Sequence, residues 1–268
     1  MSSSRRSRRA RDLAEEALMR LLDAAGEHWK DLVVVGGLVP DLIVDTDEVH
    51  QGTNDVDLVL DLGVVYDRDE LDFGWLEAAL TEGGFVPRDP RGDWNWVTDV
   101  EGEAVVLQLL VDVDDSLQLP IVLPGAPRVN AMNIQGPRPA LASAQIVTIA
   151  GRAARVATLG SYLAAKAAAI VGRDEPKDLY DFAFVLIQSE RAEPGRAAQA
   201  VREVVEHDRL LLVLTACASF SSRDADGSAA YAQLASAAGV KDEPEALALD
   251  ASSAVALFRE GLGRPAER

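Results

Sequence analysis

The sequence predicts an α/β (α+β) fold in which a mixed β-sheet flanked by helices is followed by a C-terminal helical domain. Short β-rich segments alternate with helical patterns up to about residue 158, and only helical patterns remain after that point. The 268 residues are enough for one large domain or two modest ones. We therefore expect a disordered basic arm over residues 1–12, a sheet domain over 13–157 and a helical domain over 158–268.

The first elements follow from apolar periodicity. Residues 13–25 place apolar side chains at a helical spacing, and the apolar run at 31–35 predicts a buried strand. Gly36-Gly37 ends this strand, and a helix is expected over 38–44. After a polar loop, carboxylates and aliphatic residues alternate over 55–62, which predicts a strand.

The middle of the chain alternates in the same way. A helix is expected over 69–83, and the turn Glu101-Gly102 joins strand-like runs at 94–100 and 104–113. Residues 114–141 are rich in proline and glycine, which predicts a loop with one short strand at 121–123. Strands at 145–149 and 155–158 form an expected hairpin that turns at Gly151. Helices are then expected at 161–171, 177–189, 194–206, 229–238 and 251–261.

Composition excludes several classes of protein. The net charge of −18 disfavours a general nucleic-acid binder, which needs a basic surface. The exception is the arginine-rich start of the chain, which is either a solvated tail or a contact for a nucleic acid or an acidic partner. No apolar run reaches the roughly 18 residues of a membrane span. The single cysteine, Cys217, excludes a disulfide framework, and we expect a cytoplasmic location.

Two glycines, Gly36 and Gly37, form the first candidate site. Glycines let the backbone approach a ligand closely, and N–H groups at the start of a helix bind phosphate. A turn with a purely structural role explains the same pair. The residues alone leave both interpretations open.

Asp55 and Asp57 form the second candidate site, because their spacing places both side chains on one face of a strand. Two carboxylates this close repel each other unless a cation lies between them. Mg²⁺ prefers oxygen ligands and often bridges carboxylates to substrate phosphates. The pair therefore predicts a magnesium site, with a solvent-facing strand edge as the alternative.

The third candidate site lies in two expected helices. Lys166 stands among leucine, alanine and isoleucine, where it is either solvated or projects over a cleft to hold a triphosphate. Asp178 and Asp181 are three residues apart and share a helix face. Acidic residues that favour the helix dipole at a helix start are the alternative explanation of this pair.

In this order, the motifs resemble those of AbiEii-type nucleotidyltransferases, a branch of the DNA polymerase β-like superfamily. The similarity is carried by Gly36-Gly37, Gly52-Thr53-Asn54-Asp55-Val56-Asp57, Lys166 and Lys177-Asp178-Leu179-Tyr180-Asp181. It extends over about residues 30–187 and implies a nucleotidyltransferase fold for the sheet domain. Several members of that family are toxins of toxin–antitoxin systems.

The resemblance also implies a role for each motif. Asp55 and Asp57 would be metal ligands, and Lys166 would contact the triphosphate. Asp178 would complete the catalytic set. The nucleotide would be bound by Gly36, Gly37, Thr53, Lys166 and Asp181.

The sequence departs from the family pattern at the third metal carboxylate. Gln108 stands where that carboxylate is expected, and Asp112 follows four residues later, about 13 Å along the strand. Both are candidate metal ligands. An amide oxygen can bind Mg²⁺, but it lacks the charge that activates an acceptor hydroxyl. The family's usual arginine before the carboxylates is also replaced, by the stretch that begins at His50.

The expected function is Mg²⁺-dependent transfer of a nucleotide from a nucleoside triphosphate such as ATP to an RNA or protein acceptor. A toxin would be accompanied by an antitoxin protein. One alternative is a catalytically weakened protein that binds a nucleotide or a partner, which Gln108 favours. Another is transfer to a small molecule, as antibiotic-modifying members of the superfamily perform.

Overall fold

The computed structural model describes residues 8–46, 48, 50–63, 71–114, 117–173 and 175–263. The chain divides into two compact units. The sheet unit comprises the described residues of Met1–Val39 and Gly52–Ala157, and the helical unit those of Pro40–Gln51 and Thr158–Arg268. The predicted fold class is confirmed, since a mixed sheet with helices precedes a region in which every described element is helical.

The sheet unit is built on one sheet whose described strands follow the order β3-β4-β5-β2-β1-β9-β8, with β7 pairing β5 and β6. Neighbours β2·β5 and β1·β9 are parallel, whereas β1·β2 and β4·β5 are antiparallel. The strands are β1 (Val33–Val35), β2 (Asp55–Val59), β3 (Val86–Pro87), β4 (Asn95–Val100), β5 (Glu103–Val111), β6 (Pro120–Leu123), β7 (Ala126–Asn133), β8 (Gln145–Ile149) and β9 (Arg152–Val156).

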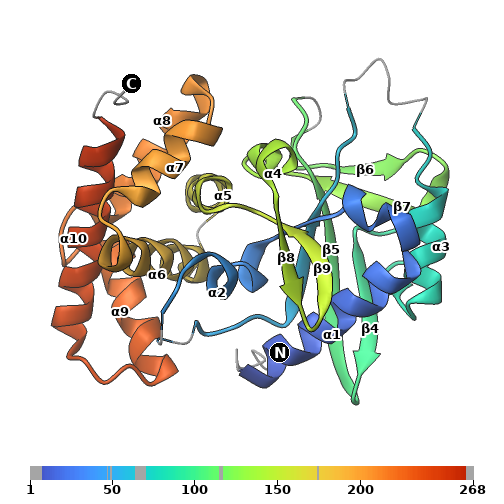
Figure 1. Cartoon of the computed structure of the whole chain (residues 1–268), viewed down its shortest axis with the longest axis horizontal. Helices are drawn as coiled ribbons and strands as arrows, with labels where there is room; N and C mark the ends of the chain where they lie inside the picture. The colour runs from blue at the N-terminus through green and yellow to red at the C-terminus, as the bar shows by residue number, and fades with distance from the viewer. Residues whose placement is uncertain are drawn as a thin grey trace. The chain divides into compact units, whose positions relative to one another are not determined.

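Alternation along β2 explains how the sheet is covered. Val56 and Leu58 are fully buried, while Asp55 and Asp57 on the opposite face are half-buried. Helix α1 (Arg8–Ala24) buries its leucines and contacts β2, β4 and β5. Figure 1 shows α1 running beside β4. The other helices of this unit are η1 (Gly26–Asp31), η2 (Gly36–Leu38), α3 (Gly74–Glu82) and α4 (Arg138–Ser143).

The helical unit packs α6 against α9 and α10, and α5 against α7 and α8 (Figure 1). Its core includes Phe182 between Phe220 and Phe258, with ring centroids 6.0 Å apart in each pair. The helices are α2 (Pro40–Ile43), α5 (Leu159–Gly172), α6 (Pro176–Ala192), α7 (Arg196–Val204), α8 (His207–Cys217), η4 (Ala218–Phe220), α9 (Asp226–Ala238) and α10 (Pro244–Leu262). Among the described residues, no helix has both the length and the apolar character required to cross a membrane.

Several element predictions need correction. The region 114–141 contains strand β7 and helix α4 in addition to the expected short strand, because β7 buries alternate residues despite Pro127. Helix α8 was not predicted, and α10 begins at Pro244, seven residues earlier than expected. Helix α1 already begins at Arg8, so this part of the expected disordered arm is helical, while residues 1–7 lie outside the described residues.

Candidate functional site

Asp57 lies at the centre of three strands in the sheet unit. Its register partners are Val35 in β1 and Gln108 in β5, and Asp55 lies two residues earlier on the same face of β2. Neighbouring strands are about 4.8 Å apart, so these side chains are lateral neighbours. The sheet therefore presents two carboxylates and one amide side by side on the face opposite the buried Val56 and Leu58.

The two glycines pack against the same strand. Gly36 has a φ of +73°, and a Cβ atom added to it would lie 2.7 Å from Cγ of Asp57 and still closer to Oδ2. A Cβ added to Gly37 would lie 2.6 Å from Cβ of Thr53. Glycine is thus required at both positions by the approach of β2 and the residues before it. The structure brings Gly36, Gly37, Thr53, Asp55 and Asp57 together within the sheet unit.

Gln108 is held by a hydrogen bond on the side away from Asp57. Its Nε2 donates to Oδ1 of Asn95 at 3.0 Å, and Asn95 is its register partner in β4. Asn95 in turn donates from Nδ2 to Oδ1 of Asp93 at 3.3 Å. Asp93 and Asn95 were not among the site residues predicted from the sequence. Their signal is the two-residue turn at Glu101-Gly102, which places Asn95 opposite Gln108.

Asp112 occupies a different environment from Asp57. It is 4% exposed, and its Oδ2 accepts hydrogen bonds from the backbone N–H groups of Gly136 and Arg138, at 2.9 Å each. The β2·β5 register ends at Val59 and Leu110, so Asp112 lies beyond the paired part of β5. This carboxylate anchors the start of α4, and we do not include it among the metal ligands.

Lys166, Asp178 and Asp181 form a buried cluster inside the helical unit. The Nζ atom of Lys166 lies 3.0 Å from Oδ1 of Asp178 and 2.6 Å from Oδ2 of Asp181. Lys166 is 7% exposed and both carboxylates are fully buried. Arg173 adds a second partner to Asp178, with Nε 2.7 Å from Oδ2. The predicted triphosphate-binding lysine thus has two internal anionic partners, as expected of a structural ion-pair residue.

The charges in this cluster shift one another's pKa. Burial alone would lower the pKa of Lys166, but the attraction of Asp181 and then Asp178 outweighs it, so the pKa is raised. Burial likewise opposes ionisation of Asp178, yet Lys166 and Arg173 hold its pKa below the usual value. Lys166 and Asp178 are therefore both charged at neutral pH.

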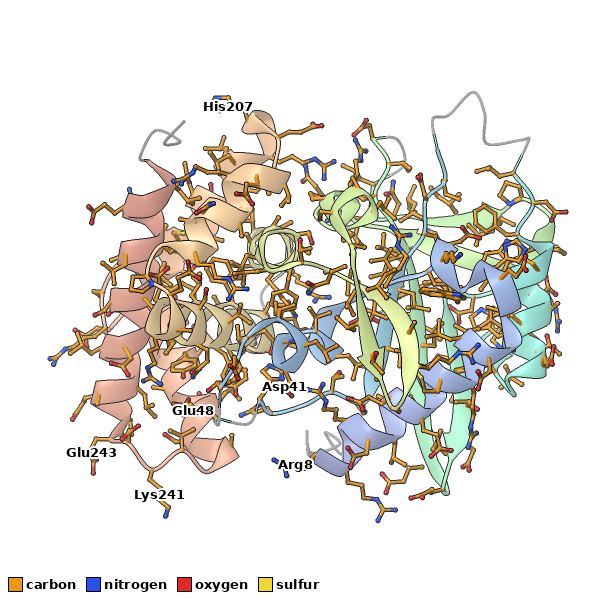
Figure 2. The ribbon with its side chains drawn as sticks, in the orientation of Figure 1. Arg8, Asp41, Glu48, His207, Lys241 and Glu243 are labelled. Atoms are coloured by element: carbon orange, nitrogen blue, oxygen red, sulfur yellow. The ribbon has the colours of Figure 1, made fainter. Side chains whose placement is uncertain are left out.

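Within the helical unit, polar contacts hold the described residues of Pro40–Gln51 against helix α6. Nε2 of the buried His50 lies 2.8 Å from Oδ1 of Asp181, and Glu48 accepts hydrogen bonds from Gln188 and Arg191. Figure 2 shows Asp41 and Glu48 on this segment. Asp41 accepts a hydrogen bond from the backbone of His50. His50, which lies inside the predicted polar loop, is thus a buried anchor, and its sequence context did not indicate this role.

Side chains on β2 and β5 supply oxygen atoms of the kind that bind a metal ion. Within the described part of the chain, no three His, Cys, Asp or Glu side chains are arranged to hold a metal ion. Asp55 and Asp57 supply two carboxylates, and Gln108 supplies a neutral oxygen. Such a set matches the way Mg²⁺ is usually held, by one or two carboxylates together with water and substrate phosphates. Because Gly36 has no Cβ atom, its backbone lies directly against the Asp57 carboxylate.

No family model and no curated protein matches the sequence. The chain is similar to the solution structure of the antibiotic-resistance factor ANT(2'')-Ia, which is described as revealing substrate-regulated conformation dynamics. The two are 14% identical, and the similarity covers 72% of this chain and 91% of the other, with a TM-score of 0.40.

Proposed function

We propose that this protein is a Mg²⁺-dependent nucleotidyltransferase. The proposal rests on one observation. Asp55 and Asp57 lie on one strand face, and they adjoin a turn at Gly36 and Gly37 that has no room for a Cβ atom. Two carboxylates on a strand favour a cation, and the neighbouring glycine backbone, which has no side chains, lets phosphate oxygens approach closely. Together they favour a ligand that contains both a cation and phosphate oxygens. A metal–nucleoside triphosphate complex has this chemistry.

In the proposed reaction, an acceptor hydroxyl oxygen forms a bond to the α-phosphorus of the triphosphate. The bond from that phosphorus to the β-phosphate oxygen breaks, pyrophosphate leaves, and the hydroxyl proton passes to solvent or to a carboxylate. Asp55 and Asp57 would hold Mg²⁺, which when bound neutralises phosphate charge. The glycine turn at Gly36 and Gly37 fixes the Asp57 carboxylate, so its orientation is set before substrate arrives.

The order of the motifs supports a finer assignment to AbiEii-type enzymes, including the toxins among them. On that assignment the acceptor is an RNA or a protein, and a toxin would have an antitoxin partner. A small-molecule acceptor is the alternative within the same chemistry. The strongly acidic chain favours acceptors that do not require a broad basic surface.

A non-catalytic nucleotide-binding protein is the second candidate, and Gln108 favours it. An amide beside Asp57 leaves the strand face with two carboxylates, and it cannot accept the proton of an attacking hydroxyl. Such a protein would bind Mg²⁺ and nucleotide in the same place without transferring the nucleotide. The two candidates therefore share the site and differ in turnover.

Transfer of label from α-labelled nucleoside triphosphates to the RNA, protein and small molecules of a cell extract tests the proposal. The wild type is compared with Asp57→Asn and with Asp61→Asn, which removes an exposed carboxylate just after β2. We expect transfer by the wild type and by Asp61→Asn, and none by Asp57→Asn. Transfer that survives Asp57→Asn would contradict the proposed site. Mg²⁺-dependent binding without transfer by any of the three proteins would favour the non-catalytic candidate.

A further inference from the structure

Asp93, Asn95 and Gln108 form a chain of hydrogen bonds whose direction can be assigned from its first member. Oδ1 of Asp93 accepts from the backbone N–H of Asn95 at 3.0 Å and from its side-chain Nδ2 at 3.3 Å. An ionised carboxylate has only acceptors, so Asn95 must turn its NH₂ group toward Asp93. Asn95 is 7% exposed, and little solvent is available to satisfy it in another orientation.

The orientation of Asn95 determines that of Gln108. With its nitrogen on Asp93, Asn95 presents Oδ1 to β5, where Nε2 of Gln108 donates to it at 3.0 Å. The amide oxygen of Gln108 must then diverge from Asn95, because oxygen and nitrogen occupy opposite branches of a planar amide. The orientation of the Gln108 amide is therefore fixed by the Asp93 carboxylate, two hydrogen bonds away. We call this chain of hydrogen bonds from Asp93 through Asn95 to Gln108 the relay.

The register places Gln108 beside Asp57 as well as beside Asn95. Gln108 is the partner of Asn95 in β4 and of Asp57 in β2, so it lies between them on one face. We infer that Asp93 and Asn95 are positioning residues that hold Oε1 of Gln108 beside Asp57 as a neutral third oxygen for the metal–triphosphate complex. This inference rests on the proposed function and deepens it.

The relay favours an amide over a carboxylate at position 108. A carboxylate at position 108 would face Oδ1 of Asn95, an acceptor opposite an acceptor, and Asn95 could reverse only by turning its oxygen toward Asp93. The amide is thus specified by its surroundings. With two negative ligands and one neutral ligand, the site should bind a divalent cation strongly only together with triphosphate oxygens.

Binding of Mn²⁺, followed by electron paramagnetic resonance with and without a non-hydrolysable triphosphate, tests the role of the relay. We expect Asn95→Leu and Gln108→Leu each to weaken Mn²⁺ binding in the ternary complex about tenfold, the lower end of the effect of outer ligands on metal affinity. Thr98→Val is the matched control, since Thr98 is a buried polar residue on the opposite face of β4 and should leave Mn²⁺ affinity unchanged.

The outcomes separate this inference from the proposed function. If the wild type binds Mn²⁺ with triphosphate, Asp57→Asn does not, and Asn95→Leu binds like the wild type, the relay has no positioning role and the proposed function stands. If Asp57→Asn binds Mn²⁺ as tightly as the wild type, or the wild type binds none, both are overturned.

A double-substitution cycle tests the hydrogen-bond direction without any ligand. Gln108→Glu is made in the wild type and in Asp93→Asn, where Asn95 can reverse, accept from the new amide at position 93 and donate to the new carboxylate. We expect Gln108→Glu to lower the melting temperature clearly in the wild type and much less in the Asp93→Asn background. An equal decrease in both backgrounds would overturn the assigned direction, even if Asn95→Leu fails to fold.

Discussion

The Asp57 carboxylate lies against the α-carbon of Gly36, so close that a Cβ atom there would overlap its Oδ2. The two residues belong to adjacent antiparallel segments, since Asp57 pairs with Val35, the residue before Gly36. This contact joins two of the candidate sequence motifs of the sheet unit, the glycine pair and the Asp55/Asp57 pair. It also explains why glycine is required in this turn even when no phosphate is bound.

Gly36→Ala should therefore displace Asp57. The left-handed backbone at Gly36 costs an alanine about 1–2 kcal/mol by itself, and the overlap with Asp57 adds to it. We expect a loss of stability above that range in urea unfolding, together with at least tenfold weaker Mg²⁺-dependent nucleotide binding. Gly151→Ala is the matched control, because Gly151 has a φ of +85° and open space around it. Equal losses in the two variants would contradict the contact.

Lys166→Met should destabilise the helical unit. The substitution leaves Asp178 and Asp181 buried with fewer cationic partners, and breaking a buried pair from one side costs about 3–5 kcal/mol. We expect a loss near the lower end, because Arg173 and His50 still contact the two carboxylates. Arg191→Met, which breaks half-exposed pairs with Glu48 and Asp250, should cost about 1 kcal/mol or less. A Lys166→Met protein as stable as the wild type, but with weaker triphosphate binding, would restore the phosphate role.

The same cluster predicts how stability depends on pH. The pKa of Asp178 is below its ordinary value of 3.8, so its contribution is complete above that pH and is lost as the pH falls through the lower folded pKa. The pKa of Lys166 is above 10.5, so its contribution is complete below that pH and is lost as the pH rises through the folded pKa. Urea unfolding from pH 7 to pH 3 should show a steeper acid loss for the wild type than for Asp178→Asn. Parallel curves would exclude Asp178 as the source.

Asp112→Ala should separate a structural carboxylate from a metal ligand. It removes the acceptor of one buried and one partly buried backbone N–H group, which costs about 1–3 kcal/mol. We expect the melting temperature to fall while Mg²⁺-dependent nucleotide binding stays at the wild-type level. Asp114→Ala, which removes an exposed partner of Arg138, should change neither property. Loss of metal dependence in Asp112→Ala alone would return Asp112 to the site.

The sheet around the site could largely be predicted from the sequence. Alternation over residues 55–62 placed Asp55 and Asp57 on one face, and the turn at Glu101-Gly102 determines that Asn95 lies opposite Gln108. The parallel pairing of β2 with β5 could not be predicted from the sequence, because tertiary packing alone joins these segments, which are more than forty residues apart. The direction of the Asp93–Asn95–Gln108 relay depends on side-chain contacts that follow from that pairing.

The helical unit shows where a local pattern was insufficient. The spacing of Asp178 and Asp181 correctly placed them on one face of α6, but not toward Lys166 on α5. A lysine among alanines looks solvated or catalytic until its partners are known. Strand β7 was missed for a similar reason, since its proline and adjacent glycine indicate a loop, whereas pairing with β5 and β6 makes it a strand.

Calorimetric titration with a nucleoside triphosphate, with and without Mg²⁺, tests whether nucleotide binding depends on a metal held by Asp57. Wild type and Asp57→Asn are compared, with Asp61→Asn as the control for loss of one negative charge. We predict tight binding only with Mg²⁺ in the wild type and in Asp61→Asn, and at least a tenfold loss of affinity in Asp57→Asn. Binding that is equally strong with and without Mg²⁺, or unchanged in Asp57→Asn, would contradict this prediction.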